Sequence, residues 1–290
     1  MNKHSKLRPS LIAFLALVAI AIWSSVLEKP MASGNLTLSV LDVGQGDSLL
    51  VTTPLGHHVL VDAGPTSQVT AKLDAALPRS GRAIDLAIVS HNHADHIGGM
   101  IAVINRFTVD QFWLSGATDT TQVYIDMLQA LKDRRVPTKA VIAGDTTTFD
   151  GVKFTVLYPI TSQVGLRPEN QHDAMVAVLV EYKSRSMVLT GDLESSKEAE
   201  ILKAGEITHT IDVLKVGHHG STTSTSDAWL DALKPSIAVI SVGAKNMFGH
   251  PAPSTVTKLT NRGIQVLRTD QNGTVDVVTD GERIWTKTEK

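Results

Sequence analysis

The chain has 290 residues, of which 42% are hydrophobic and 19% are charged, and this mix excludes a disordered or low-complexity chain. There is no cysteine, which excludes disulfide scaffolds, thiolate zinc sites and cysteine nucleophiles, so a transition metal here needs His and carboxylate ligands. The net charge is −2 overall and −5 over residues 31–290, where 23 Lys and Arg face 28 Asp and Glu. Such an acidic body lacks the basic surface typical of nucleic-acid-binding proteins.

The first 30 residues have the pattern of an export signal. Residues 2–8 are basic, Leu11–Trp23 is an unbroken apolar run, and Ser24–Leu27 extends it to about the shortest length that spans a bilayer. No clear small-residue cleavage site precedes Asn35. We expect residues 1–30 to be a cleaved signal peptide or an inner-membrane anchor, with an extracytoplasmic (periplasmic or secreted) body. A core helix at the start of the domain is the alternative.

Strands and helices alternate through the rest of the chain, first in a half that ends near residue 160. Alternation of apolar residues and turn signals predict three strands in a meander, then a helix, a buried strand and a helix. A strand, a helix and two strand-rich segments follow. In chain order these are Leu36–Leu41, Ser48–Thr53, His57–Asp62, Val69–Leu77, Ala83–Ser90, Ile97–Arg106, Phe112–Leu114, Thr120–Arg135, Pro137–Phe149 and Val152–Tyr158.

A loop, Thr161–Asp173, leads into a second half of similar style. It opens with a strand hairpin across Lys183–Arg185 and continues with alternating helices and strands. The predicted elements are Met175–Tyr182, Ser186–Thr190, Ser195–Lys203, Ile211–Val216, Asp227–Leu233, Ile237–Ser241, Pro253–Arg262, Ile264–Thr269 and Val275–Thr279. Two halves of this kind predict an α/β fold, a four-layer αββα sandwich formed by one domain over residues 36–290.

The segment Ser90–Gly99 (SHNHADHIGG) carries the strongest chemical signal in the chain, because it places three His and an Asp between an apolar strand and a helix. His91 and His93 are two residues apart on an extended segment and project to one side. Asp95 and His96 lie where the chain turns into the helix and point to a neighbouring position. Imidazole with carboxylate suits Zn²⁺, Mn²⁺ or Fe, whereas a surface His cluster is the alternative.

Further candidate ligands stand at the ends of other predicted strands. Asp62, Asp192 and the pair His218–His219 each follow one, and strand ends on one rim of an α/β sheet are where sites are built. Each residue alone has a structural explanation, as a turn residue, a helix N-cap or a satisfied polar group. Four strand ends with His or Asp in one chain favour a shared site.

These motifs resemble the metallo-β-lactamase superfamily, whose signature is H-x-H-x-D-H. More narrowly, the chain is similar to the C-terminal hydrolase domain of ComEC-type DNA-internalisation competence proteins. The resemblance runs from about Leu36 to Asp280, and no multi-spanning channel part accompanies it. The matching stretches are LDVGQGDSLLV (41–51), VDAG (61–64), LTGD (189–192), LKVGHHGSTTSTS (214–226), FGHPAP (248–253) and LRTDQNGTV (267–275).

The resemblance implies a site for two divalent ions, Zn²⁺ or Mn²⁺. His91 and His93 would hold the first ion, and His172 either completes its ligands or is a loop residue. Asp95, His96 and one His of the doublet would hold the second, with Asp192 bridging both. We favour His218 as that ligand and His219 as an outer or substrate contact, although the sequence leaves the doublet unresolved. In the outer layer, Asp62 would orient a ligand His, and Asp42 and Asp47 flank a tight Gly44–Gly46 loop that approaches the metals.

A pair of ions that activates a water suggests a metal-dependent hydrolase, with a phosphodiester substrate, DNA among the candidates. Asp95 would orient the nucleophile, and His219 or His250 would stabilise developing charge or protonate the leaving oxygen. The acidic body keeps a small phosphodiester or a phosphocholine-type ester as an alternative substrate. A non-catalytic exported binding module is the competing class of function. No protein partner is expected, and the membrane is contacted only if the N-terminal segment is retained.

Overall fold

The computed structural model describes residues 10, 14–18, 34–77 and 82–290 of the chain. Most of the segment 1–30, for which export is predicted, lies outside the described residues. Where the structure describes the chain, no helix combines the length and the apolar character needed to cross a membrane.

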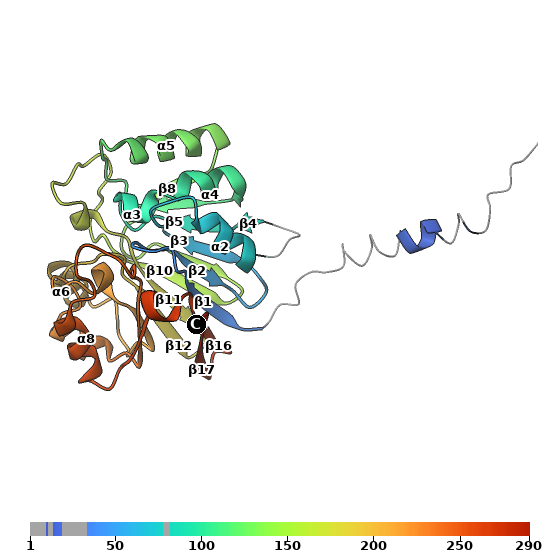
Figure 1. Cartoon of the computed structure of the whole chain (residues 1–290). Helices are drawn as coiled ribbons and strands as arrows, with labels where there is room; N and C mark the ends of the chain where they lie inside the picture. The colour runs from blue at the N-terminus through green and yellow to red at the C-terminus, as the bar shows by residue number, and fades with distance from the viewer. Residues whose placement is uncertain (1–9, 11–13, 19–33, 78–81) are drawn as a thin grey trace, which may run out of the picture.

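Two large sheets form the centre of the molecule (Figure 1). In the first sheet, four neighbouring strands (β3, β5, β7 and β8) run parallel and the remaining pairs are antiparallel. Its eight strands, in spatial order, are β17 (Ile284–Thr288), β16 (Val275–Thr279), β1 (Leu36–Val40), β2 (Leu49–Thr52), β3 (His58–Val61), β5 (Leu86–Ile88), β7 (Phe112–Leu114) and β8 (Thr138–Ala140).

The second sheet has seven strands and also combines a parallel with an antiparallel part. Its strands, in spatial order, are β15 (Gln265–Arg268), β14 (Ile237–Ile240), β13 (Val213–Lys215), β12 (Arg185–Leu189), β11 (Ala177–Tyr182), β10 (Val152–Tyr158) and β9 (Thr146–Phe149). A small parallel pair, β4 (Ala83–Ile84) with β6 (Thr108–Val109), stands apart from both sheets.

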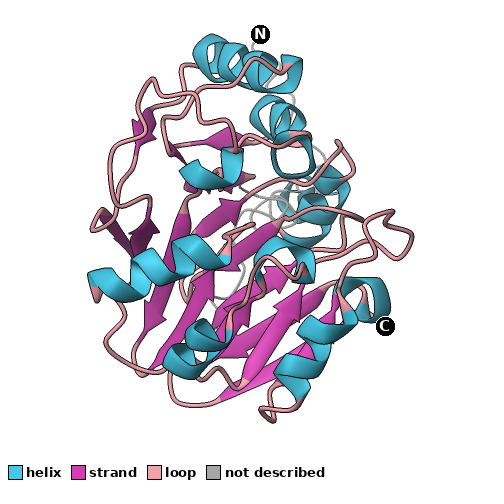
Figure 2. Cartoon of the chain, turned by 90° about the vertical axis from the view of Figure 1, so that its left-hand side faces the viewer, coloured by secondary structure: helices cyan, strands magenta, loops and turns pink. Residues whose placement is uncertain are grey.

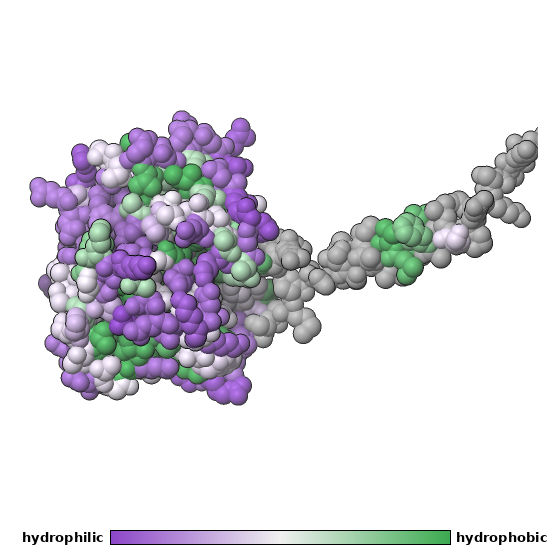
Figure 3. Space-filling view, in the orientation of Figure 1, coloured by the Kyte–Doolittle hydropathy of each residue, from purple (hydrophilic) through white to green (hydrophobic). Residues whose placement is uncertain are grey.

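Helices cover the outer face of each sheet (Figures 1 and 2). One group packs on the first sheet and the other on the second, each over its own apolar core. The helices are α2 (Val69–Ala76), α3 (Ala94–Ile97), α4 (Met100–Arg106), α5 (Gln122–Arg134), α6 (Ser195–Ala204), α7 (Asp227–Leu233), α8 (Pro253–Thr260) and α9 (Thr269–Asn272). The face seen in Figure 3 is largely hydrophilic between smaller apolar patches. The predicted four-layer αββα sandwich is confirmed.

A third core lies between the two sheets and holds them together. Alternate residues of β1, Leu36, Leu38 and Val40, enter it from the first sheet, and Phe154 on β10 enters it from the second. All four are almost fully buried. Side chains that alternate across a strand leave one face for this inner core and the other for the helices, which is why each strand serves two layers.

The structure differs from the predicted elements at a few points. The apolar run Ala83–Ser90 splits into β4 and β5 because Asp85 turns its carboxylate to the backbone N–H of His58, at 2.7 Å. The predicted helix Ile97–Arg106 is broken at Gly98–Gly99, where a Cβ would lie 2.1 Å and 2.2 Å from the carbonyl oxygens of Pro65 and Ala63.

Some short elements have no counterpart in the prediction. Pro137–Phe149 holds two strands, β8 and β9, that belong to different sheets, and β6, α9 and the edge strand β17 were not predicted. The predicted loop Thr161–Asp173 leads into a 3-10 turn, Gln171–Ala174, that contains His172.

Phe154→Ala tests the inter-sheet core. Phe154 is 0% exposed, so its loss leaves a cavity between the sheets and is expected to lower the free energy of unfolding by about 3–5 kcal/mol. Urea unfolding followed by circular dichroism measures this change. Phe248→Ala is the matched control, because Phe248 is 66% exposed and its loss is expected to change stability by no more than about 0.5 kcal/mol. Equal effects of the two substitutions would contradict the assigned core.

Candidate functional site

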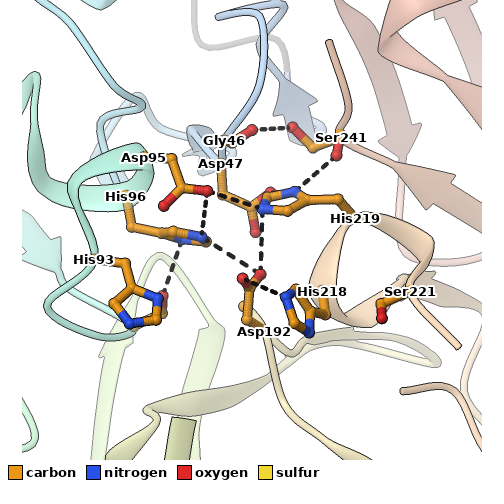
Figure 4. A network of polar contacts seen from close by, with 12 residues as sticks. Gly46, Asp47, His93, Asp95, His96, Asp192, His218, His219, Ser221 and Ser241 are labelled. Atoms are coloured by element: carbon orange, nitrogen blue, oxygen red, sulfur yellow. Dashed lines mark hydrogen bonds and ion pairs between the residues drawn. The ribbon is translucent and has the colours of Figure 1, made fainter. Parts of the chain in front are cut away.

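The candidate ligands gather at one edge of the sandwich, where strands of both sheets end (Figure 4). Asp62 follows β3 and His91 follows β5 in the first sheet, whereas Asp192 follows β12 and His218 follows β13 in the second. Each pair of strands runs parallel, so their carboxyl ends meet at the same edge. Residues more than a hundred positions apart in the chain therefore share one site.

Three His rings form the first group of donors, which we call the His group: His91, His93 and His172. Nε2 of His91 lies 2.9 Å from Nδ1 of His93. The ring of His172 lies 5.1 Å from that of His91 and 4.8 Å from that of His93, measured between centroids. One donor atom from each of the three falls within 4.8 Å of the others, a spacing that suits one metal ion.

The second group, which we call the Asp95 group, consists of Asp95, His96 and His219. Oδ2 of Asp95 lies 3.3 Å from Nε2 of His219 and 3.8 Å from Nε2 of His96. Together with Asp192, these residues form a second set of donor atoms within 4.8 Å of one another. Asp95 comes from the start of α3, whereas His219 comes from the 3-10 turn Gly217–Gly220 on the opposite sheet.

Asp192 stands between the two groups and turns one oxygen to each. Its Oδ1 lies 3.4 Å from Nε2 of His96 and 3.5 Å from Nε2 of His219. Its Oδ2 lies 3.8 Å from Nε2 of His172 and 4.0 Å from Nε2 of His91. This is the arrangement in which one carboxylate can bridge two cations.

Burial and charge shape the protonation of these groups. Burial lowers the pKa of His91 well below its usual range. Burial acts in the same direction on His219, but the neighbouring carboxylates, Asp192 foremost, outweigh it and raise its pKa to about 9. Burial alone would raise the pKa of Asp192, whereas His219 and His96 hold it well below its usual range. A bound cation would supply the positive charge that the proton on His219 provides, so metal binding would release that proton.

The residues present fit a divalent metal. Nε2 of His96, His172 and His219 are buried without a hydrogen-bond partner, and so is Oδ1 of Asp192. Buried polar atoms are rarely left unpaired, and these four all face the space between the two groups. Imidazole nitrogens and carboxylate oxygens are ligands that Zn²⁺ and Mn²⁺ accept.

Hydrogen bonds from the outside orient two of the His rings. Asp62 Oδ2 lies 2.8 Å from Nδ1 of His96, and Asp62 Oδ1 accepts the backbone N–H of Ser90 at 2.8 Å. Nδ1 of His219 donates to the carbonyl oxygen of Ser241 at 2.9 Å. With the proton on Nδ1, each ring presents the lone pair of Nε2 to the site. Asp62 thus lies where the sequence placed it, behind a candidate ligand.

His218 and His219 lie opposite to the expectation from the sequence, which favoured His218 as the ligand and His219 as the outer contact. His219 is 2% exposed and belongs to the Asp95 group, whereas His218 has a side chain 24% exposed and lies with Nε2 3.8 Å from Oδ2 of Asp192. Both residues have positive φ, 49° and 52°, which turns the two consecutive rings in different directions. His218 therefore faces the mouth of the site, and its Nδ1 contacts Oγ1 of Thr223 at 3.1 Å.

The Gly44–Gly46 loop does approach the site, but its two flanking carboxylates diverge. Gly46 has a φ of 126°, and a Cβ there would lie 2.0 Å from the carbonyl oxygen of Asp95. Asp47 is fully buried, with Oδ1 3.4 Å from Nδ1 of His219. Asp42 instead accepts the backbone N–H of Gly44 and lies 3.7 Å from Nζ of Lys290, away from both donor groups. The structure thus corrects the placement of Asp42.

Lys215 is a site residue that the sequence analysis missed. It is 0% exposed, and its Nζ forms an ion pair with the equally buried Asp47. Burial raises the pKa of Asp47, but Lys215 and His219 outweigh it and hold this pKa below its usual range. Glu194, whose Oε1 lies 3.3 Å from Nδ1 of His172, was missed as well. A charged residue inside the apolar strand Ile211–Val216 was the available signal for Lys215.

The donor groups open into a pocket of about 220 Å³, which Gln45, Phe248 and His250 help to line. The ring of His250 lies 5.8 Å from that of His218. A larger cavity of about 360 Å³ lies elsewhere, between α2 and strands β1, β2 and β16, and has no His in its wall. We assign function to the smaller pocket, because it alone of these two is lined by His together with Asp.

Comparisons with known proteins identify the family of the chain. Residues 41–244 match the metallo-beta-lactamase superfamily. The chain is 30% identical to ComE operon protein 3 of Bacillus subtilis, over 85% of this chain and 33% of that protein. It is 29% identical to competence protein ComA of Neisseria gonorrhoeae, over 89% of this chain and 34% of that protein. The resemblance predicted from the motifs is confirmed, and the chain spans about a third of the length of these relatives.

A solved structure shares the fold. Igni18, described as a novel metallo hydrolase from the archaeon Ignicoccus hospitalis, superposes with a TM-score of 0.51 at 15% identity. The match covers 83% of this chain and 98% of that one.

His219→Ala and His218→Ala form a matched pair that tests the ligand assignment. Removing His219 takes a donor from the Asp95 group, so we expect this variant to bind about one divalent ion fewer per chain than the wild type. His218→Ala is expected to keep the wild-type content, since both groups remain complete. Elemental analysis of the purified, folded variants gives the stoichiometry, and the reverse pattern would reassign the ligand to His218.

Lys215→Met tests the buried ion pair. The substitution leaves the carboxylate of Asp47 uncompensated in the interior, so the free energy of unfolding should fall by about 3–5 kcal/mol. The double variant Lys215→Met with Asp47→Asn removes both charges and should recover much of that loss. Chemical denaturation measures both variants, and a single variant as stable as the wild type would show that the pair does not matter.

Proposed function

Because this chain belongs to the metallo-β-lactamase superfamily and has the metal-dependent hydrolase fold of that superfamily, we propose that it is a phosphodiesterase. The observation that carries the proposal is the position of Asp192, whose two oxygens face two separate groups of donors. The ion assignment follows from it. The His group, His91, His93 and His172, would hold one divalent ion, the Asp95 group would hold the other, and Asp192 would serve both.

Two divalent ions, Zn²⁺ or Mn²⁺, would supply Lewis-acid activation of water and of the phosphoryl oxygen. Asp95 is suited to orient the attacking water and accept its proton, because its side chain is 33% exposed and reaches the pocket. Burial would raise the pKa of Asp95, but His219 and His96 lower it, which keeps the carboxylate ionised at neutral pH.

His218 and His250 take the role of substrate contacts at the mouth of the pocket. Burial lowers the pKa of His218 to about 4 and also lowers that of His250, so both rings are neutral at pH 7. A neutral imidazole carries one N–H donor. Each ring is therefore suited to donate a hydrogen bond to an oxygen of the phosphoryl group or of the leaving group.

Similarity to two competence-related proteins supports DNA as the substrate. The net charge of −5 over residues 31–290 favours a small phosphodiester instead, because an acidic body lacks the electrostatic grip on a polyphosphate. We also propose that the enzyme is exported, since a basic flank precedes the apolar run Leu11–Trp23. A non-catalytic binding module is disfavoured, because both donor groups have three members and the shared carboxylate is in place.

Metal analysis combined with a substrate panel tests the proposal. We expect two divalent ions per chain, and turnover of bis(p-nitrophenyl) phosphate and single-stranded DNA that EDTA abolishes. Asp192→Asn should lower kcat/KM by more than about 100-fold, because the residue serves both ions, whereas Asp62→Asn, which acts through His96, should lower it about 10–100-fold. Wild-type protein that carries both ions and cleaves neither substrate would disprove the phosphodiesterase assignment.

A further inference from the structure

The loop after β14 presents two large apolar side chains to solvent, and one of them lines the pocket. Met247 is 95% exposed and Phe248 is 66% exposed, so two consecutive large apolar side chains face solvent. Phe248 lines the same pocket as Asp192 and His218. The other residues of that pocket are polar or charged, so the aromatic ring stands at the edge of a polar site.

Asn246 holds this loop in place from inside. Its side-chain amide donates to the carbonyl oxygens of Gly243 and His250, at 2.8 Å and 2.7 Å. Its side-chain oxygen accepts the backbone N–H groups of Phe248 and His250, at 3.2 Å and 3.0 Å. These four hydrogen bonds of one side chain fix the backbone of the loop in the conformation that exposes Phe248.

The loop also contacts the Gly44–Gly46 loop, which packs against Asp95. The backbone N–H of Gly243 donates to Oε1 of Gln45 at 3.2 Å, and a Cβ on Gly243 would lie 2.7 Å from the backbone nitrogen of Gln45. Gln45 precedes Gly46 in the loop that packs against Asp95. The backbone of Phe248 is therefore linked to the loop beside Asp95 through hydrogen bonds of Asn246 and Gly243.

One face of the Phe248 ring is already occupied. His250 stacks on it with ring centroids 5.9 Å apart and an interplanar angle of 17° (stacked). His250 in turn lies 5.8 Å from His218, whose Nε2 faces Asp192. A row of rings thus leads from the bridging carboxylate to the outer face of Phe248, where a further flat group can continue the stack.

We propose that Phe248 is a platform for an unpaired nucleobase next to the scissile phosphodiester, which makes single-stranded nucleic acid the substrate class. The inference rests on the proposed phosphodiesterase function. Stacking of a base on an aromatic side chain is tolerant of sequence and needs a base whose faces are free. Lys245 in the same loop is exposed and forms no ion pair among the described residues, so it adds a cation for a neighbouring phosphate.

Base stacking also explains how a chain with a net negative charge can bind a nucleic acid. Base–aromatic contacts contribute affinity without requiring a basic groove. Such contacts suit this chain, because residues 31–290 have a net charge of −5. A duplex hides the faces of its bases and would be gripped mainly through phosphates. The structure therefore favours a single strand over a duplex as the substrate.

The test compares two strands that have the same number of phosphates, hexathymidylate and an abasic hexamer. Binding is measured by fluorescence anisotropy on metal-loaded protein with phosphorothioate-linked strands, which resist hydrolysis, and cleavage with the ordinary phosphodiester strands. For Phe248→Ala we expect the preference for the thymidine strand over the abasic strand to fall about 5- to 150-fold, and Phe248→Trp should restore it. Leu55→Ala, which removes a 69% exposed side chain from the turn after β2, should keep the wild-type preference.

The outcomes separate the two proposals. Equal losses on both strands, or no loss on either, would overturn the platform whatever the cleavage rates. Base-dependent binding through Phe248 without cleavage of either strand or of bis(p-nitrophenyl) phosphate would overturn the phosphodiesterase function and leave the platform standing. Preferential binding of the thymidine strand by the wild type, lost in Phe248→Ala and restored in Phe248→Trp, supports it.

Discussion

The buried carboxylate of Asp192 is the constraint on which the rest of the site depends. It is 2% exposed, and its Oδ1 has no hydrogen-bond partner. A buried charge is costly unless other charges compensate it, so the surrounding residues must supply positive charge or hold a cation. The first sheet contributes His91 and His96, and the second contributes His219 next to Asp192 itself. The site exists only when the sandwich has closed, and the inter-sheet core is therefore also the support of the chemistry.

Compensation extends one layer further out, through groups that never face the pocket. Asp62 fixes His96 from the first sheet, and the pair of Lys215 and Asp47 lies behind His219. These partners alternate in sign from the interior to the pocket, so each buried charge has a neighbour of the opposite sign or a hydrogen bond. On the side of the pocket, Nε2 of His96 and His219 and Oδ1 of Asp192 have no hydrogen-bond partner, and a metal ion would bind there.

The strands and most candidate ligands could be predicted from the sequence, because the apolar pattern marks the strands and the ligands follow the ends of those strands. Conformation within a few residues was not predictable. Whether His218 or His219 faces the Asp95 group depends on two consecutive positive φ angles, which residue types alone do not dictate. Asp42 and Asp47 flank the same glycines, yet only Asp47 turns inward, because Lys215 from the other sheet meets it there. That contact joins residues 168 positions apart in the printed sequence.

The charge of the body and the chemistry of the site can be reconciled through a division of roles. Phosphate binding over a long groove requires many basic residues and releases many counterions, which an acidic surface cannot provide. A compact centre needs positive charge only at the scissile group, and a pair of divalent ions concentrates it there. The ring row from His218 through His250 to Phe248 then extends the site outward without adding charge. An acidic chain can in this way act on a polyanion, provided that it recognises the nucleobase and that metal ions held by the His and Asp ligands bind the phosphate.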